Sequence, residues 1–171
     1  MCDNDSLDDM LRYQVRSREL SRRQFGALSV GAGLMALLPP VANAVEVKES
    51  EVEIKTPDGT ADAYFVHPAT GAHPGVLVWP DIFGLRTAFR QMGKRLAESG
   101  YSVLVVNPFY RTKRAPTSPE GANFQDPEVR KAVFALAATL SPETHFTDAK
   151  AFVSWLDSQP SVDKKRKMAT T

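Results

Sequence analysis

The chain has 171 residues, of which 43% are hydrophobic and 24% charged, and 21 Lys and Arg against 20 Asp and Glu give a formal net charge of +1. This length predicts one globular domain, and the balanced charge, with no basic stripe interleaved with aromatic residues, excludes nucleic acid as a partner. The single cysteine, Cys2, excludes a disulfide framework and a thiolate metal site built from this chain alone.

The first 44 residues are predicted to be an export signal that does not belong to the fold. Residues 1–23 are polar, and an uncharged apolar run of 14 residues follows from Phe25 to Leu38. In a helix such a run reaches about 21 Å, which is shorter than the roughly 30 Å hydrocarbon core of a bilayer. It therefore fits a signal h-region, and the small residues Ala42-Asn43-Ala44 behind it predict cleavage after Ala44.

Arg22 and Arg23 stand just ahead of Phe25, and together with the apolar run they resemble the twin-arginine export signal. This resemblance implies that a bacterial-type cell exports the protein in its folded state. The export machinery is then an expected partner, and the mature segment, residues 45–171, is expected to be periplasmic or secreted. An ordinary Sec signal and a retained membrane anchor are the alternatives.

The mature segment opens with a predicted hairpin. Apolar residues alternate with charged ones over 47–55, as in an edge strand with one face in water. Pro57-Asp58-Gly59 is a turn signal, and residues 61–66 return from it. After a break, the unbroken apolar run 75–79 predicts a strand that is covered on both faces.

A βαβ unit follows. Residues 87–99 carry apolar side chains on one helical side, and Gly100 is placed to end that helix. Residues 101–106 form the next buried strand. The order strand, helix, strand predicts a parallel pair with a right-handed crossover.

The remaining segments continue the alternation. Residues 107–126 form a long loop rich in Pro, Thr and Lys, and helical periodicity resumes at Pro127. A second helix is predicted over 146–158, followed by a basic turn over 161–167 and by the opening of another strand at Met168. A strand that ends after four residues would have no helix to cover it, so we expect the chain to be truncated.

Two segments that follow the buried strands form the predicted ligand site. Ligands bind outside the carboxyl ends of parallel strands, where residues 79–85 and 107–111 would lie. Asp81 and Arg111 are then expected neighbours at this rim, and the arginine fork would hold a substrate carboxylate. A structural Asp–Arg pair, or an aspartate that caps a turn, is the alternative.

The other polar and aromatic candidates indicate structural roles. His67, His73 and His145 have no hydroxyl or thiol placed beside them, so we interpret them as solvated or capping residues. They are also too scattered for a metal site, and we expect no metal and no other cofactor. Trp79 and Trp155 are predicted to lie in the core.

Five segments occur in the order and spacing of the dienelactone hydrolase family. They are the opening hairpin, His73–Trp79, Asp81–Leu85, Leu96–Arg111 and Phe152–Asp157. The resemblance covers nearly the whole mature segment. It implies a carboxymethylenebutenolidase-like α/β-hydrolase fold, with a mostly parallel sheet and flanking helices, that acts on small-molecule esters or lactones.

The resemblance also implies roles for single residues. The backbone N–H of Ile82 would help to form the oxyanion hole. Asp81 stands where the family usually has Glu, which interacts with the nucleophile in the cysteine enzymes, and Arg111 matches an arginine associated with the substrate carboxylate.

The family places a Cys or Ser nucleophile directly after the strand that Met168 opens, with an Asp and a His further on. No G-x-S-x-G or G-x-C-x-G motif occurs in the 171 residues, so no residue of a triad is assigned.

We therefore interpret the chain as the amino-terminal part of an exported hydrolase, cut before the nucleophile elbow. A non-catalytic binding module on a hydrolase scaffold is one alternative. An exported flavodoxin-like redox protein is the other, although the bulky Ile82 and Phe83 stand where a glycine-rich phosphate loop would be needed.

Overall fold

The computed structural model describes residues 41–170, so Arg22 and Arg23 lie outside the described residues, and Ala44 lies in the exposed segment before the first strand. The elements are β1 (Val47–Thr56), β2 (Gly59–Pro68), β3 (His73–Val78), α4 (Thr87–Glu98), β4 (Ser102–Val106), α5 (Pro127–Ala137), α6 (Pro142–Ser158) and β5 (Val162–Thr170). Among the described residues, no helix is both long and apolar enough to cross a membrane.

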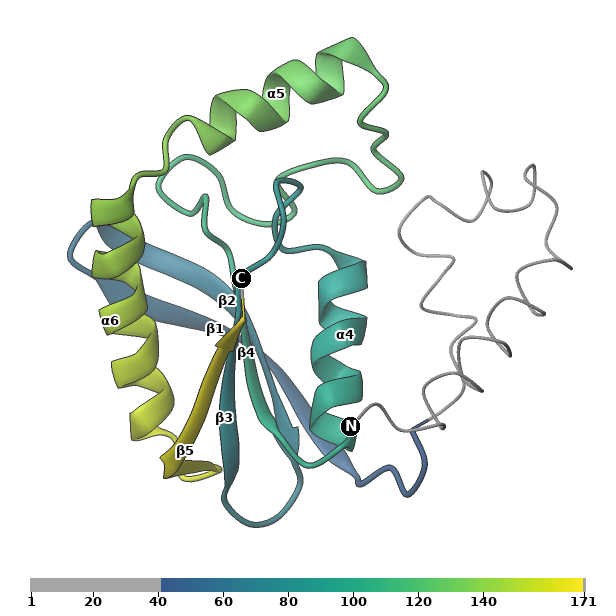
Figure 1. The fold of residues 1–171 in the computed structure, drawn as a ribbon, viewed down its shortest axis with the longest axis vertical. Helices are drawn as coiled ribbons and strands as arrows, with labels where there is room; N and C mark the ends of the chain where they lie inside the picture. Colours follow the sequence, from purple (N-terminus) through teal and green to yellow (C-terminus); the bar gives the residue numbers. More distant parts are fainter. Residues whose placement is uncertain (1–40, 171) are drawn as a thin grey trace, which may run out of the picture.

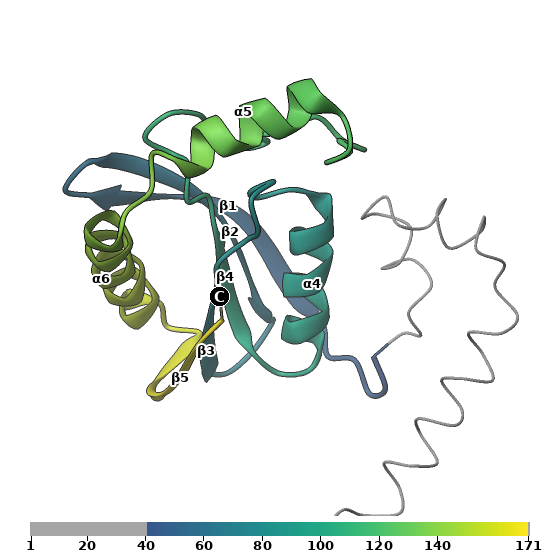
Figure 2. The same ribbon diagram turned by 45° about the horizontal axis from the view of Figure 1, so that its top comes forward.

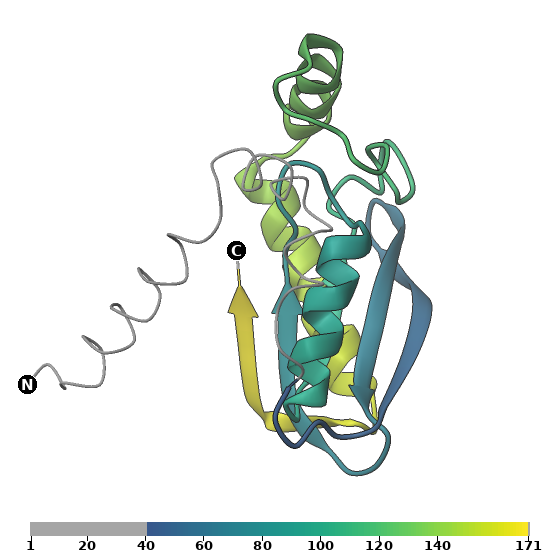
Figure 3. The same cartoon turned by 90° about the vertical axis from the view of Figure 1, so that its right-hand side faces the viewer.

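The five strands form one sheet in the order β1-β2-β4-β3-β5. The hairpin strands β1 and β2 pair antiparallel, and β2 pairs antiparallel with β4. Strand β3 runs parallel to β4 on one side and to β5 on the other, as the predicted βαβ unit requires. Strands β1 and β5 therefore form the two edges of the described sheet (Figure 3).

Helices α4 and α6 cover opposite faces of the sheet (Figure 1). Because side chains alternate along a strand, each face has its own apolar cluster. The cluster facing α6 includes Ile54, Ala61, Ala63, Phe65, Leu77, Leu104, Val106, Phe152 and Leu156. The cluster facing α4 includes Tyr64, Val66, Val76, Val78, Ala97, Val103 and Val105. The sequence predicts this two-faced burial for the central strands, and the structure confirms it.

The helix ends follow local chemistry. Helix α4 stops before Gly100, which adopts φ +95°, as predicted. Helix α6 begins at Pro142, earlier than the predicted start at residue 146. Ser141 and Thr144 form a capping box there, and Pro142 occupies a first-turn position that needs no N–H donor.

The predicted basic turn over 161–167 is part of a strand. Strand β5 pairs Asp163 with Pro74 and then Lys167 with Gly75, so the residues between Asp163 and Lys167 bulge out of the ladder. The Asp163 carboxylate accepts hydrogen bonds from Lys165 N at 3.0 Å and from Arg166 Nε at 2.7 Å, which holds the bulge closed. The prediction of a turn was wrong because the bulge is embedded in a continuing strand.

Helix α5 and the long loop before it lie beyond the ends of the strands (Figure 2). The loop over 107–126 contains no helix or strand, as predicted. Helix α5 buries Val133, but Phe134 remains 53% exposed. Its apolar residues follow a helical period, yet most of this apolar side is not packed into either cluster.

Candidate active site

The site predicted from the strand ends is built by two loops. One loop joins β3 to α4 and contains residues 79–86, and the other follows β4 from Asn107 onward. Because β3 and β4 are parallel neighbours, both loops leave the sheet at the carboxyl ends of these strands. The structure therefore confirms that these two segments lie at one rim.

The loop from Asp81 to Arg86 is closed by its own side chains. Gly84 N donates to Asp81 O at 2.8 Å to form a turn, and Phe83 N donates to Asp81 Oδ1 at 3.0 Å. Arg86 forms a bidentate ion pair with Asp81, with Nη2 2.9 Å from Oδ2. Asp81 thus combines a turn-capping role with an ion pair, and its partner is Arg86.

A second set of contacts ties this loop to the segment after β4. The hydroxyls of Thr117 and Ser118, both buried, donate to Phe83 O at 3.0 and 2.9 Å. Gly84 has φ +73°, and a Cβ at this position would collide with Thr117 Oγ1. The loop backbone is therefore held from both sides.

Ile82 occupies the second position of the Asp81–Gly84 turn and is half-buried. Within residues 41–170 its backbone N–H makes no hydrogen bond. This N–H is therefore available to donate to water or to a ligand.

Arg111 lies in a network with two aspartates. Nη1 and Nη2 donate to the two carboxylate oxygens of Asp148 at 2.8 and 2.7 Å, and Nε and Nη2 donate to Asp58 at 3.0 and 2.6 Å. Asp148 is only 2% exposed. The expected meeting of Asp81 and Arg111 is not observed, because each residue is paired with another charge.

Tyr110 completes the network. Its hydroxyl donates to Asp148 Oδ1 at 2.8 Å and lies 2.8 Å from Thr56 Oγ1. Burial, followed by the hydrogen bond to Asp148, raises the pKa of Tyr110 to about 12, and the hydrogen bond to Asp148 also raises the pKa of Arg111. The network joins the β1–β2 turn, the loop after β4 and helix α6.

The raised pKa of Tyr110 predicts a loss of stability at high pH. Its ordinary pKa is 10.0, so above pH 10 the unfolded chain releases this proton while the folded chain retains it up to about pH 12. The free energy of unfolding should therefore decrease as the pH rises through this range. Urea unfolding at several pH values should show a shallower decrease for Tyr110→Phe than for the unmodified chain. Equal slopes would contradict the assignment.

The three histidines bind backbone carbonyl groups, in agreement with the structural roles predicted for them. Nδ1 of His67 lies 2.7 Å from Pro68 O, Nδ1 of His73 lies 3.2 Å from Gly100 O, and Nδ1 of His145 lies 2.9 Å from Ser141 O. In the described part of the chain, no group of three or more His, Cys, Asp or Glu residues is arranged to hold a metal ion.

The two tryptophans pack against the α6-side cluster but are only partly buried. The ring of Trp79 stacks on His145 with centroids 5.5 Å apart, and Trp155 meets Phe65 edge-on at 5.0 Å. Both residues therefore lie at the margin of the core that was predicted for them.

Sequence reasoning missed most of the partners in this site, namely Asp58, Arg86, Thr117, Ser118 and Asp148. One of them carries a usable signal. Asp148 stands four residues before Phe152 and eight before Leu156, so it lies on the buried side of the predicted helix. A carboxylate on a buried helical face requires a partner, which Arg111 provides.

The mixed sheet with helices on both faces and a loop of this kind after β3 is typical of the α/β-hydrolase fold. The crystal structure of a "Putative Dienelactone Hydrolase" from Klebsiella pneumoniae subsp. pneumoniae shares this fold, with a TM-score of 0.60 and 21% identity over 72% of this chain and 49% of that one. An esterase from Pyrobaculum calidifontis aligns with a TM-score of 0.51 and 19% identity over 94% of this chain and 46% of that one.

The sequence comparisons identify the family. A model of the "Dienelactone hydrolase family" matches residues 61–170, which is more than half of the chain. A "Putative carboxymethylenebutenolidase" of Methylorubrum extorquens is 32% identical over 114 residues, covering 62% of this chain and 39% of the relative. The chain therefore belongs to the dienelactone hydrolase family, and it spans well under half the length of this relative.

Proposed function

We propose that this chain is the amino-terminal part of an exported hydrolase that cleaves ester or lactone bonds, and that the nucleophile lies outside its 171 residues. Within the described residues, the Ile82 N–H lies in a fixed loop at the carboxyl end of β3 and makes no hydrogen bond, and this observation carries the proposal. Family membership supports hydrolysis, and the absence of a nucleophile elbow motif from the sequence supports the second part.

The positions of β5 and Ile82 are compatible with acyl transfer. Strand β5 is the parallel neighbour of β3. A nucleophile on an elbow after β5 would therefore lie at the carboxyl ends of the strands, on the same side as Ile82. Attack on the substrate carbonyl carbon moves an electron pair to the carbonyl oxygen, and the Ile82 N–H would donate to that oxyanion. When the tetrahedral intermediate collapses, the bond to the alkoxide breaks and the alkoxide leaves with a proton from a general acid. Water then attacks the acyl-enzyme, and collapse of a second intermediate releases the carboxylic acid and the nucleophile.

Asp81 and Arg111 have supporting roles in this proposal. Asp81 shapes the oxyanion loop through Arg86, and its short side chain limits its reach toward a nucleophile. Arg111 would bind the carboxylate of a carboxylate-bearing substrate by exchanging Asp58, which is 45% exposed, while it keeps the buried Asp148. The substrate is then a small ester or lactone, with or without a carboxylate.

A complementation assay tests the proposal. The 171-residue chain alone is expected to show no turnover of phenyl esters or lactones above background, because it supplies no activated nucleophile. Joined to the nucleophile-, acid- and histidine-bearing half of a family member, it should hydrolyse these substrates. The same joined protein with its nucleophile replaced by Ala is the control.

Two results would contradict the proposal. Turnover by the purified 171-residue chain would place the nucleophile inside it. Inactivity of a folded joined protein would favour a non-catalytic binding module on the hydrolase scaffold.

Export through the twin-arginine route is a further part of the proposal. Replacing Arg22 and Arg23 together by Lys should leave the precursor in the cytoplasm, because this route reads the arginine pair. Cell fractionation followed by immunoblotting measures the distribution. Unchanged export that depends on the Sec machinery would overturn this part without affecting the hydrolase assignment.

A further inference from the structure

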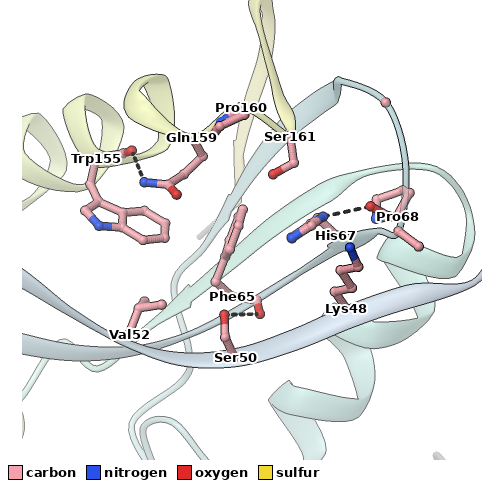
Figure 4. A pocket seen from close by; sticks show the side chains of 12 residues that line it. Lys48, Ser50, Val52, Phe65, His67, Pro68, Trp155, Gln159, Pro160 and Ser161 are labelled. Carbon is pink, nitrogen blue, oxygen red and sulfur yellow. Dashed lines mark hydrogen bonds between the residues drawn. The ribbon is translucent and has the colours of Figure 1, made fainter.

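A pocket opens at the point where helix α6 ends. The helix stops at Ser158, and Pro160 cannot continue it, whereas the β1–β2 ladder runs further along the sheet. The uncovered part of the ladder becomes the floor of a pocket of about 600 Å³ (Figure 4). This volume lies in the range of small-molecule sites.

The floor and one wall of the pocket are aromatic. Lys48 pairs with His67 and Ser50 pairs with Phe65 across the two strands, so all four side chains share one face of the sheet. The rings of Phe65 and His67 are 5.1 Å apart, and the indole of Trp155 meets Phe65 edge-on. Phe65 is only 4% exposed, so a flat ring would pack against the exposed parts of His67 and Trp155.

The polar groups around this floor are few and directed. Nδ1 of His67 donates to Pro68 O at 2.7 Å, which leaves Nε2 toward the pocket (Figure 4). The amide nitrogen of Gln159 donates to Trp155 O at 3.1 Å and to Ser158 Oγ at 2.9 Å, so Oε1 remains as an acceptor on the pocket side. Lys48 adds an ammonium group beside His67.

The charge of the pocket is positive. None of its twelve lining residues is acidic. The neighbouring glutamates of β1, Glu49 and Glu51, point to the opposite face of the sheet, where they pair with Lys94 and Arg90. Among the described residues, Lys48 has no carboxylate partner in the pocket, and its single charge favours a monoanion.

We propose that this pocket is a binding site for a small aromatic carboxylate, with the ring on His67 and Trp155 and the carboxylate at Lys48. The lining residues come from β1, β2, the β2–β3 turn and the end of α6, at the end of the sheet where β3 and β5 begin, whereas residues 81–86 lie at the carboxyl end of β3. Among the described residues, neither pocket serine, Ser50 nor Ser161, hydrogen-bonds to the His67 imidazole, so the pocket holds no paired nucleophile and base. Its function is therefore binding.

Tryptophan fluorescence provides a direct test, because the chain has two tryptophans and one of them lines the pocket. In a Trp79→Phe variant of the full chain, benzoate should change the Trp155 emission in a saturable way. Calorimetric titration of the unmodified chain should give the same Kd. Acetate, which lacks the ring, and benzylamine, which carries the opposite charge, should not saturate the site.

Two variants and a matched control test whether benzoate binds in this pocket. Lys48→Gln should weaken benzoate binding about fivefold, the effect of a partly exposed charge pair. Ser50→Leu should abolish binding by filling the floor while Lys48 remains. Lys55→Gln is the matched control, because Lys55 is on the same strand but outside the pocket, with Nζ on Thr60 Oγ1 at 2.9 Å, and it should leave the Kd unchanged.

The proposal is overturned if benzoate fails to saturate the unmodified chain, or if acetate or benzylamine binds equally well. It is also overturned if Lys48→Gln and Lys55→Gln have the same Kd, since the charge that selects the ligand would then lie elsewhere.

Discussion

Arg111→Met is expected to lower the free energy of unfolding by about 3–5 kcal/mol, the usual cost of removing one partner of a buried ion pair. Methionine keeps much of the apolar stem, so the main loss is the charge that compensates Asp148. That carboxylate is 2% exposed and, among the described side chains, would retain the Tyr110 hydroxyl as its hydrogen-bond donor. Urea unfolding followed by circular dichroism measures the change.

Two surface pairs serve as controls for this prediction. Asp58→Asn removes the exposed partner of Arg111, and Arg114→Gln removes an ion pair with Glu53 in which both side chains are more than half exposed. Asp58→Asn should cost about 1 kcal/mol or less, and Arg114→Gln should leave the stability nearly unchanged because its pair is exposed to solvent. If Arg111→Met costs no more than these controls, the buried pair does not stabilise the fold in the way proposed.

Ile82→Pro should reduce the kcat of the joined, nucleophile-bearing enzyme by about 10²–10³, the effect of losing one oxyanion donor. Proline has no backbone N–H, so the substitution removes the donor itself. Ile82 is the second residue of the Asp81–Gly84 turn, a position that favours proline, and the loop should therefore keep its shape. KM should change much less than kcat, because the oxyanion exists only in the intermediate and the flanking transition states.

Ile82→Val is the matched control for the donor. It shortens the side chain and keeps the N–H, so kcat should stay within a small factor of the unmodified enzyme. An unchanged kcat in folded Ile82→Pro would show that other groups stabilise the oxyanion. The Ile82 N–H would then no longer support the proposed function.

Much of the fold follows from local patterns in the sequence. The apolar runs of β3 and β4, the alternation along β1 and the glycine that ends α4 each predict the element that the structure contains. The bulge in β5 and the exposed side of α5 were not predictable in this way. The bulge depends on the pairing partner at Pro74, and the exposure of Phe134 depends on where the long loop places the helix.

The site was predictable in position but not in pairing. The rule for parallel strands and the family resemblance both place Ile82 and Asp81 at the rim, and the structure has them there. The sequence did not predict the ion-pair partners of Arg111, because Asp148 and Asp58 are 37 and 53 residues away from it along the chain. Arg86 lies only five residues from Asp81, yet the chain has many arginines and carboxylates, and the folded turn decides which of them meet.

The network of Arg111 with Asp58 and Asp148 also affects the rate of unfolding. It joins the β1–β2 turn to α6, and neither can reach Arg111 until the hairpin and the helix have both docked on the sheet. Contacts that close such long loops form late, so the network should be weakly formed in the folding transition state. Because these ion pairs form after the transition state, they mainly lower the rate of unfolding and have little effect on the rate of folding.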